Sequence, residues 1–395
     1  MSVREIRPGV HWVGAIHWDR RLFDELIPLP DGTTYNAYLI AGSEKTALID
    51  SVDPVKEAEH IDNLQSLRVE KLDYIIANHA EQDHSGGIRK LTEIYPMAKV
   101  VTNQKCRNML MDLLLIPEER FVVVGDHDTL SLGDRTLEFI IAPWVHWPET
   151  MLTYLREDRI LFPCDLFGSH LATSELYATD EARVYESAKR YYAEIMMPFR
   201  NVIKKHLVKL EEYKIDVIAP SHGPLHNKPA FIVDAYRDWT SDTVKNEVIL
   251  PYVSMHGSTE AMVNHLIGKL IERDIVVKPF NLTKTDIGEL AIALVDAATI
   301  VIATPTVLVG PHPAAAYAAY LANALRPKAK YASVIGSYGW GSKMLEQITG
   351  MLGNLKIELI TPVIIKGHPK KEDYQALDRL AGSIMEKHKA SGIIR

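Results

Sequence analysis

The chain has 395 residues, of which 47% are hydrophobic and 24% charged, with a formal net charge of −7 and two cysteines. This length suits two globular domains with separate cores, and a negative chain without a dense basic segment is a poor match for nucleic acid. Because two cysteines cannot form a disulfide framework and no apolar stretch has membrane-spanning length, we expect a cytoplasmic protein without a membrane partner.

The first 240 or so residues alternate short strand patterns with helical segments. Apolar or alternating runs predict strands over residues 35–40, 46–50, 74–77, 136–141 and 217–220. Helical periodicity predicts helices over residues 88–95, 187–210 and 231–246, the last of which leads out of the domain. We therefore predict a first domain over residues 1–246.

A dense group of polar side chains follows the predicted strand 74–77, namely His79, Glu81, Asp83 and His84. Nitrogen and oxygen ligands that converge on the end of a buried strand suit a divalent metal, because the scaffold must fix each ligand. A polar loop between a strand and a helix is the plain alternative, but such a loop does not need this crowding.

Three further residues occupy the same kind of position. His146 follows the strand 136–141, Asp165 follows an apolar run at 160–163, and His222 closes the strand 217–220. A single histidine at a strand end is usually a hydrogen-bonded residue. The joint placement of all three after the first group favours a metal site.

From residue 248 the pattern changes to a regular alternation of strand, loop and helix. Strands are predicted over residues 248–253, 275–280, 299–303, 331–335 and 357–362, with helices between them, for example 260–271 and 314–325. Five apolar strands with intervening helices indicate an open, doubly wound parallel sheet that is covered on both faces. We therefore predict a second, α/β domain over residues 247–395.

The loop after the first of these strands contains Ser254, Met255, His256, Gly257, Ser258 and Thr259. Hydroxyls, a glycine and free backbone N–H groups at a helix N-terminus form an anion site that suits a phosphate. The loop lacks the Gly-Lys-Ser/Thr of nucleoside-triphosphate sites and the Gly-x-Gly-x-x-Gly of dinucleotide sites. The single phosphate of FMN is therefore the predicted ligand, and plain helix capping by serine or threonine is the alternative.

Two later loops would lie beside the same cofactor. They contain Pro305, Thr306, Val307 and Leu308 after the third strand, and Ser337, Tyr338, Gly339, Trp340 and Gly341 after the fourth. In a doubly wound sheet the ligand lies outside the carboxyl ends of the strands, so these loops would flank the flavin ring. Glycines allow close approach, and Trp340 or Tyr338 can cover an aromatic ring, although Trp340 could also be an ordinary surface aromatic. This half resembles a flavodoxin.

The first half resembles the metallo-β-lactamase superfamily, whose ligands stand at successive strand ends in this chain order. The resemblance implies an αββα sandwich, which is two β-sheets flanked by helices. Hydrolases of that superfamily commonly carry His-x-His-x-Asp-His, whereas this chain has Glu81 in the second ligand position. A carboxylate makes the site harder and more anionic, which favours iron over zinc and redox chemistry over hydrolysis.

A domain of this kind followed directly by a flavodoxin-like domain resembles the flavodiiron proteins, or A-type flavoproteins. Matching motifs cover the whole chain and lie at residues 32–39, 78–79, 146–148, 191–193 and 221–223. The resemblance implies FMN and a non-haem di-iron site, with no catalytic residue beyond the metal ligands. It assigns one iron to His79, Glu81 and His146, the other to Asp83, His84 and His222, and the bridging position to Asp165.

The resemblance also implies an activity, which is reduction of dioxygen to water, of nitric oxide to nitrous oxide, or of both. FMN would relay electrons from an external donor such as rubredoxin or a reduced deazaflavin, in a head-to-tail homodimer or a homotetramer. Four residues match pocket or supporting positions: Asp24, where several members have a histidine, Trp147, His170 and Tyr192. The alternatives are a zinc hydrolase fused to a flavodoxin, and an electron carrier with a vestigial metal site.

Overall fold

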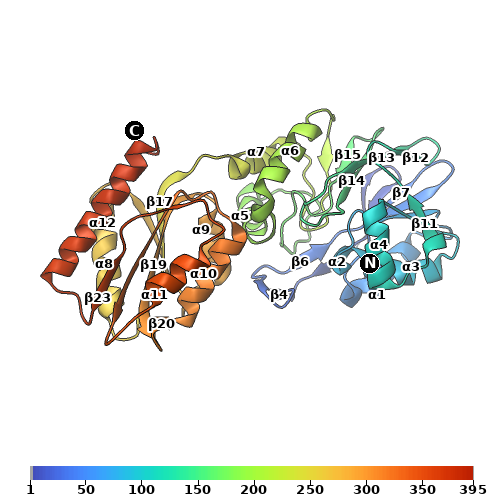
Figure 1. The fold of residues 1–395 in the computed structure, drawn as a ribbon. Helices are drawn as coiled ribbons and strands as arrows, with labels where there is room; N and C mark the ends of the chain where they lie inside the picture. Colours follow the sequence, from blue (N-terminus) through green and yellow to red (C-terminus); the bar gives the residue numbers. More distant parts are fainter. Residues whose placement is uncertain (1–2, 395) are drawn as a thin grey trace. The chain divides into compact units, whose positions relative to one another are not determined.

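A computed structural model describes residues 3–394 (Figure 1). The chain divides into two compact units, of which the first runs to Tyr192 and resumes over Phe199–Thr240, and the second comprises Ala193–Pro198 and the residues from Ser241 onward. The predicted boundary at residue 246 falls within strand β17 (Lys245–Tyr252) of the second unit. Within the described residues, no helix is both long and apolar enough to cross a membrane.

The first unit is built on two sheets. The larger has the strand order β1-β2-β7-β8-β9-β10-β11, in which the neighbours from β8 to β11 are parallel and the others antiparallel. Its strands are β1 (Arg4–Arg7), β2 (Val10–Trp12), β7 (Tyr38–Ala41), β8 (Thr46–Ile49), β9 (Tyr74–Ile76), β10 (Lys99–Thr102) and β11 (Phe121–Val123). The smaller sheet contains β12 (Thr129–Ser131), β13 (Thr136–Ile141), β14 (Met151–Leu155), β15 (Ile160–Phe162) and β16 (Val217–Ile218).

The two sheets pack face to face around a shared apolar core. Trp12 and Tyr38 of the larger sheet and Phe139 and Phe162 of the smaller one are buried in a single cluster. A second cluster joins the other face of the larger sheet to helices that cover it, namely α1 (Glu57–Ser66), α3 (Ile88–Ile94) and α4 (Gln104–Leu114). The predicted sandwich is therefore confirmed.

Short elements complete the first unit. Two short antiparallel pairs join β3 (Ala15–His17) to β6 (Thr33–Tyr35) and β4 (Leu22–Phe23) to β5 (Ile27–Pro28). Beside the smaller sheet lie α5 (Glu181–Tyr191), α6 (Arg200–Leu210) and α7 (Pro229–Thr240), and the ring of Tyr213, just after α6, packs on Tyr154 of β14. The remaining helical turns are η1 (Pro54–Lys56), α2 (Gln82–Ser85) and η2 (Glu118–Arg120).

The predicted strand 35–40 is interrupted, because β6 ends at Tyr35 and β7 begins at Tyr38. At the break, the Asn36 backbone N–H donates to Ser221 O (2.8 Å), and its side-chain amide donates to the carbonyls of Pro220 (2.7 Å) and Gly223 (2.8 Å). These bonds tie the break to the loop that contains His222. The alternation of side chains did not reveal the break, because the residues on both sides of it are buried.

The predicted helix 187–210 is wrong as a single helix. It comprises α5, a π turn (Tyr192–Met196), a short 3-10 turn (Met197–Phe199) and α6. Pro198 has no N–H to donate and its ring clashes with the preceding turn, so it cannot lie inside a regular α-helix. The predicted helix 231–246 also ends early, since α7 stops at Thr240 and β17 begins at Lys245.

The second unit is an open parallel sheet with the order β18-β17-β19-β21-β22, and β23 also pairs with β21. The strands besides β17 are β18 (Val276–Asn281), β19 (Ala297–Val307), β21 (Tyr331–Tyr338), β22 (Glu358–Leu359) and β23 (Val363–Lys366). A short antiparallel strand, β20 (Gly310–Pro311), folds back on the end of β19. This order, 2-1-3-4-5, is that of a flavodoxin-like fold and confirms the predicted fold class.

Helices cover both faces of this sheet (Figure 1). Residues of α8 (Ser258–Ile271) and α12 (Lys371–Ala390) share one buried cluster with the strands, and α9 (Ile287–Leu294), α10 (Pro313–Leu325) and α11 (Met344–Met351) lie on the other face. The predicted fifth strand 357–362 is wrong in extent. Pro362 lacks a backbone N–H for the ladder, and the edge is divided into β22 before it and β23 after it.

One buried histidine gives the first unit an acid-sensitive stability. His60 of α1 is fully buried, its Nδ1 donates to Val13 O (2.7 Å), and its Nε2 makes no hydrogen bond among the described residues. Burial lowers the pKa of His60 to about 4. In the unfolded chain His60 has a pKa of ~6.5 and therefore binds a proton more tightly than in the folded protein. The contribution of neutral His60 to stability is complete above ~pH 6.5 and is lost as the pH falls towards 4.

We expect His60→Asn, which can still donate to Val13 O, to remove about 3 kcal/mol of this acid dependence between about pH 6.5 and 4. Urea unfolding across that pH range measures it. His11→Asn, at a half-buried position on β2, is the matched control and should leave the pH dependence unchanged. Equal pH dependence in the His60 variant and the unmodified chain would contradict the assignment.

Candidate metal centre and phosphate-binding loop

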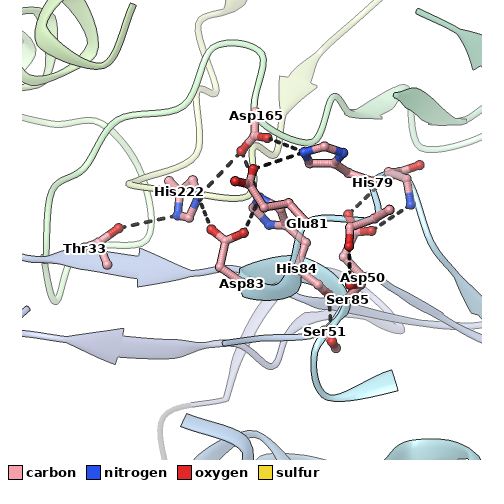
Figure 2. Close-up of polar contacts among 12 residues, drawn as sticks. Thr33, Asp50, Ser51, His79, Glu81, Asp83, His84, Ser85, Asp165 and His222 are labelled. Atoms are coloured by element: carbon pink, nitrogen blue, oxygen red, sulfur yellow. Dashed lines mark hydrogen bonds and ion pairs between the residues drawn. The ribbon is translucent and has the colours of Figure 1, made fainter. Parts of the chain in front are cut away.

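The structure brings all seven predicted ligand residues together at one edge of the sandwich. Figure 2 shows His79, Glu81, Asp83, His84, Asp165 and His222 facing one another. They come from the loops that follow β9, β13, β15 and β16. The loop after β9 leads into the short helix α2, which carries Asp83 and His84. Their side chains range from fully buried to about one-seventh exposed. Successive strand ends therefore converge, as the sequence pattern predicts, at a site that is largely closed to water.

The ligand atoms fall into two groups. One contains His79, Glu81, His146 and Asp165, and the other contains Asp83, His84 and His222, with the atoms of each group within 4.8 Å of one another. Asp165 faces both groups. Its Oδ2 is 3.6 Å from His79 Nε2 and 3.5 Å from His146 Nε2, and its Oδ1 is 3.0 Å from His84 Nε2 and 3.5 Å from His222 Nε2. This is the arrangement of a carboxylate that bridges two ions.

Each group has a second carboxylate close to its two imidazoles. Glu81 Oε2 lies 3.2 Å from His79 Nε2 and 3.1 Å from His146 Nε2. In the other group, Asp83 lies 3.0 Å from His222 Nε2 through Oδ2 and 3.3 Å from His84 Nε2 through Oδ1. Metal–ligand bonds of about 2.0–2.2 Å place neighbouring ligand atoms about 3 Å apart, so these separations suit two coordinated ions.

The hydrogen bonding of the cluster also fits metal ions. Both carboxylate oxygens of Asp83, both ring nitrogens of His84, and Asp165 Oδ2 are buried without a hydrogen bond in the described part of the chain. His84 Nε2 lies 3.0 Å from Asp165 Oδ1, yet the geometry is not that of a hydrogen bond. Buried polar atoms without partners are costly, and cations between the two groups would satisfy them.

The carboxylates and imidazoles of the cluster shift one another's pKa values. Burial lowers and the neighbouring carboxylates raise the pKa of His79, His84 and His146, with a net value of about 10 for each. Burial raises and the imidazoles lower the pKa of Asp165, which lies well below its usual range. Metal ions would replace the imidazolium protons, since metal ligands must be deprotonated.

Partners outside the cluster turn the ligand atoms towards it. His79 Nδ1 lies 2.7 Å from Glu149 Oε1, His222 Nδ1 donates to Thr34 O (2.6 Å), and the Tyr191 hydroxyl donates to Asp165 Oδ1 (2.8 Å). In each histidine the Nε2 therefore faces the other ligands. Neither Glu149 nor Tyr191 was identified from the sequence as a functional residue.

The structure also places the four predicted pocket residues. The Trp147 ring stands edge-on to the His79 ring, with centroids 5.0 Å apart, and His170 packs on His222 with centroids 4.8 Å apart. Asp24 lies in the turn between β4 and β5. Tyr192 donates its hydroxyl to Trp239 O (3.2 Å), so the tyrosine whose hydroxyl reaches the cluster is its neighbour, Tyr191.

In the second unit, the loop after β17 leads directly into α8. Gly257 precedes the first residue of the helix with a φ of +84°, a conformation that favours glycine. Ser254 Oγ accepts from the N–H groups of Gly257 and Glu260 (both 3.2 Å), which folds the loop over the start of the helix. The hydroxyl of Thr259 is buried without a hydrogen bond among the residues described. An unpartnered hydroxyl at a helix N-terminus fits a phosphate group.

The other two predicted loops meet beside this one at the carboxyl ends of the strands. The Thr306 hydroxyl donates to Ser342 Oγ (2.8 Å), which joins the end of β19 to the loop after β21. Trp340 and Leu308 are 88% and 94% exposed. Among the described residues, a Cβ built on Gly339 or Gly341 would meet no atom within 4 Å apart from its chain neighbours. Open backbone with exposed apolar side chains fits the flat ring of FMN. The same three loops also carry the other residues predicted to bind FMN, namely Met255, His256, Ser258, Pro305, Val307, Ser337 and Tyr338.

The chain is similar over nearly its whole length to known proteins. Residues 33–223 match the family described as ODP family beta lactamase. A nitric oxide reductase from Moorella thermoacetica is 36% identical over 389 residues, which cover 96% of this chain and 97% of that protein. The structure of rubredoxin oxygen:oxidoreductase from Desulfovibrio gigas matches with a TM-score of 0.95 and 29% identity, covering 98% of this chain and 99% of that one. A flavodiiron protein from Giardia intestinalis matches with a TM-score of 0.89 and 27% identity over 98% of each chain.

Proposed function

The chain belongs to the flavodiiron protein family of oxidoreductases, and from that premise we propose that it reduces dioxygen, nitric oxide or both at a di-iron site. The observation that supports this proposal most is the position of Asp165, which turns one carboxylate oxygen to each of two ligand groups. Two ions held by one bridging carboxylate suit the joint reduction of two oxygen atoms or two nitric oxide molecules.

In this proposal each group of side chains has a defined role. His79, Glu81 and His146 hold one iron, Asp83, His84 and His222 hold the other, and Asp165 binds both. The loop 254–259 binds the FMN phosphate, and the loops 305–308 and 337–341 flank its ring. When bound, the two ferrous ions supply two electrons together and FMN supplies electrons singly from an external donor.

In this proposal, residues around the metal site control the entry of the gas and the supply of protons. The Trp147 indole covers one side of His79, and the Phe23 ring packs on His170 with centroids 5.2 Å apart. Burial, followed by the negative charges of Glu81 and Asp83, raises the pKa of the Asp24 carboxyl. Reduction of either gas consumes protons, so the Asp24 carboxyl, which is exposed to solvent in the turn between β4 and β5, would suit a proton donor near the ligand carboxylates.

The electron donor in this proposal is rubredoxin or a reduced soluble cofactor such as a deazaflavin. A rubredoxin iron centre needs four thiolates, whereas these 395 residues contain two cysteines, Cys106 and Cys164, which are both buried. The similar protein from Desulfovibrio gigas is named for rubredoxin and oxygen. The proposed assembly is a head-to-tail homodimer or a homotetramer.

Anaerobic stopped-flow kinetics tests the proposed activity. The flavin of iron-loaded protein is reduced, the protein is mixed with dioxygen or with nitric oxide, and flavin reoxidation, water, peroxide and nitrous oxide are measured. We expect at least one gas to reoxidise the iron-loaded protein much faster than protein stripped of iron, with water or nitrous oxide as the product. Equal rates with and without iron would contradict the proposal.

The same preparations separate the two alternatives. Zinc in both groups, together with turnover of esters or lactams, would favour a hydrolase. Full gas-reducing activity in a Glu81→Ala variant would favour an electron carrier with a vestigial metal site.

A further inference from the structure

The two halves of the metal cluster differ in what lies behind their histidines. In the first group, His79 Nδ1 is paired with Glu149 Oε1 at 2.7 Å, and the side chains of both residues are fully buried. In the second group, His222 Nδ1 donates to a neutral acceptor, the backbone carbonyl of Thr34, and His84 Nδ1 makes no hydrogen bond within residues 3–394. The ligands themselves are otherwise matched, since each group has two imidazoles, one carboxylate of its own and a share of Asp165.

Glu149 is held in place from several directions. Its Oε1 also accepts from the Ala80 N–H (3.0 Å), and its backbone carbonyl accepts from the Asn103 side-chain amide (2.6 Å). Its Oε2 is buried and makes no hydrogen bond among the described residues. The carboxylate is therefore a fixed anion whose direction towards the His79 ring does not depend on a flexible surface group.

The two oxygens of the Asp165 carboxylate also differ in their hydrogen bonding, and the difference again favours stronger donation to the first group. Asp165 Oδ1, which faces the second group, accepts a hydrogen bond from the Tyr191 hydroxyl (2.8 Å). Asp165 Oδ2, which faces the first group, makes no hydrogen bond in the part of the chain that the structure describes. A hydrogen bond withdraws electron density from the oxygen that accepts it, so the oxygen aimed at the first group is the stronger donor.

We propose that Glu149 is a positioning residue that makes the two irons unequal, an inference that rests on the proposed di-iron function. A carboxylate that accepts the Nδ1 proton makes the imidazole a stronger donor through Nε2. A stronger donor stabilises ferric over ferrous iron, so the iron held by His79, Glu81 and His146 has the lower reduction potential. When one electron is withdrawn from the diferrous protein, the ferric ion therefore lies in the first group.

The experiment is a potentiometric titration of ⁵⁷Fe-loaded protein, followed by EPR and Mössbauer spectroscopy, with Glu149→Gln as the main variant. Glutamine keeps the size and an acceptor oxygen but removes the charge. We expect the substitution to raise the reduction potential of the iron in the first group by about 59 mV, which is a tenfold shift towards the ferrous ion. The two potentials then lie closer together, so the fraction of protein with one ferric and one ferrous ion falls. Two bound irons with unchanged potentials would overturn the proposal.

Two further measurements keep the test decisive if the glutamine variant binds iron poorly. Tyr191→Phe removes the hydrogen bond to Asp165 Oδ1, so the two potentials should move closer together, and an unchanged separation would count against the proposal. Cobalt titration of metal-free protein should show that Glu149→Gln weakens one of two sites by about 10–100-fold, whereas equal weakening of both sites would overturn it. None of these measurements uses either gas, and unmodified protein that binds no pair of metal ions would instead contradict the proposed function.

Discussion

Protein with the substitution Asp165→Ala is expected to lose both irons and at least about three orders of magnitude of gas-reducing activity. Among the described residues, Asp165 is a carboxylate that approaches imidazoles of both ligand groups, at 3.0 to 3.6 Å. Its removal leaves each group one ligand short and leaves the buried imidazoles with less compensating negative charge. Elemental analysis and anaerobic stopped-flow kinetics measure the two losses.

A matched control for this variant is Asp216→Ala. Asp216 lies in the same unit, just before β16, but it is half-exposed and its partner is Arg159 at 3.5 Å. We expect the control to keep its iron and activity, and both variants to keep FMN, because the proposed flavin loops lie in the other unit. An Asp165→Ala protein that retains two irons and activity near that of the unmodified chain would contradict the bridging role.

The second large effect is expected at the flavin loop. There, Thr259→Val should weaken FMN binding but make the FMN-free protein more stable to unfolding. Valine matches the shape of threonine but lacks the buried hydroxyl, which has no hydrogen-bond partner among the residues described. Loss of a hydrogen bond to a phosphate should weaken FMN binding by about 10–100-fold, since such bonds contribute about 1.5–3 kcal/mol. Removal of an unpaired buried hydroxyl should stabilise the FMN-free protein by about 1 kcal/mol.

Thr299→Val provides the comparison, because it is the same change at another buried site of the same unit. The Thr299 hydroxyl lies 2.7 Å from His388 Nε2, so its loss should destabilise the protein and leave FMN binding unchanged. Flavin fluorescence measures the affinity, and urea unfolding of FMN-free protein measures the stability. FMN binding by Thr259→Val as tight as in the unmodified chain would remove this hydroxyl from the proposed site.

Much of the fold could be predicted because local pattern and global structure agree. Apolar runs such as Ile75-Ile76 are central strands, and the regular alternation after residue 248 gives the doubly wound sheet. The errors occur where backbone hydrogen bonding changes over a few residues. Asn36 divides one predicted strand through bonds to a loop more than 180 residues away, and Pro198 and Pro362 each remove an N–H inside a predicted element.

The candidate metal site was predictable for a different reason. Residues such as His79 and His222 stand at strand ends, where chain order and chemical type together indicate convergence before any distance is known. The residues behind them were not predictable in this way. Glu149 meets His79 across 70 residues, and Tyr191 meets Asp165 across 26, so neither contact has a local signature. The available signal was position, because Glu149 directly follows the motif at 146–148 and Tyr191 lies within the motif at 191–193.

The most direct test is the Mössbauer spectrum and iron content of protein purified from iron-replete cells. The structure predicts two irons per chain that are magnetically coupled through a shared carboxylate, in sites with mixed nitrogen and oxygen ligands. One iron per chain, two uncoupled ions, or zinc in both positions would contradict the proposed di-iron site bridged by Asp165.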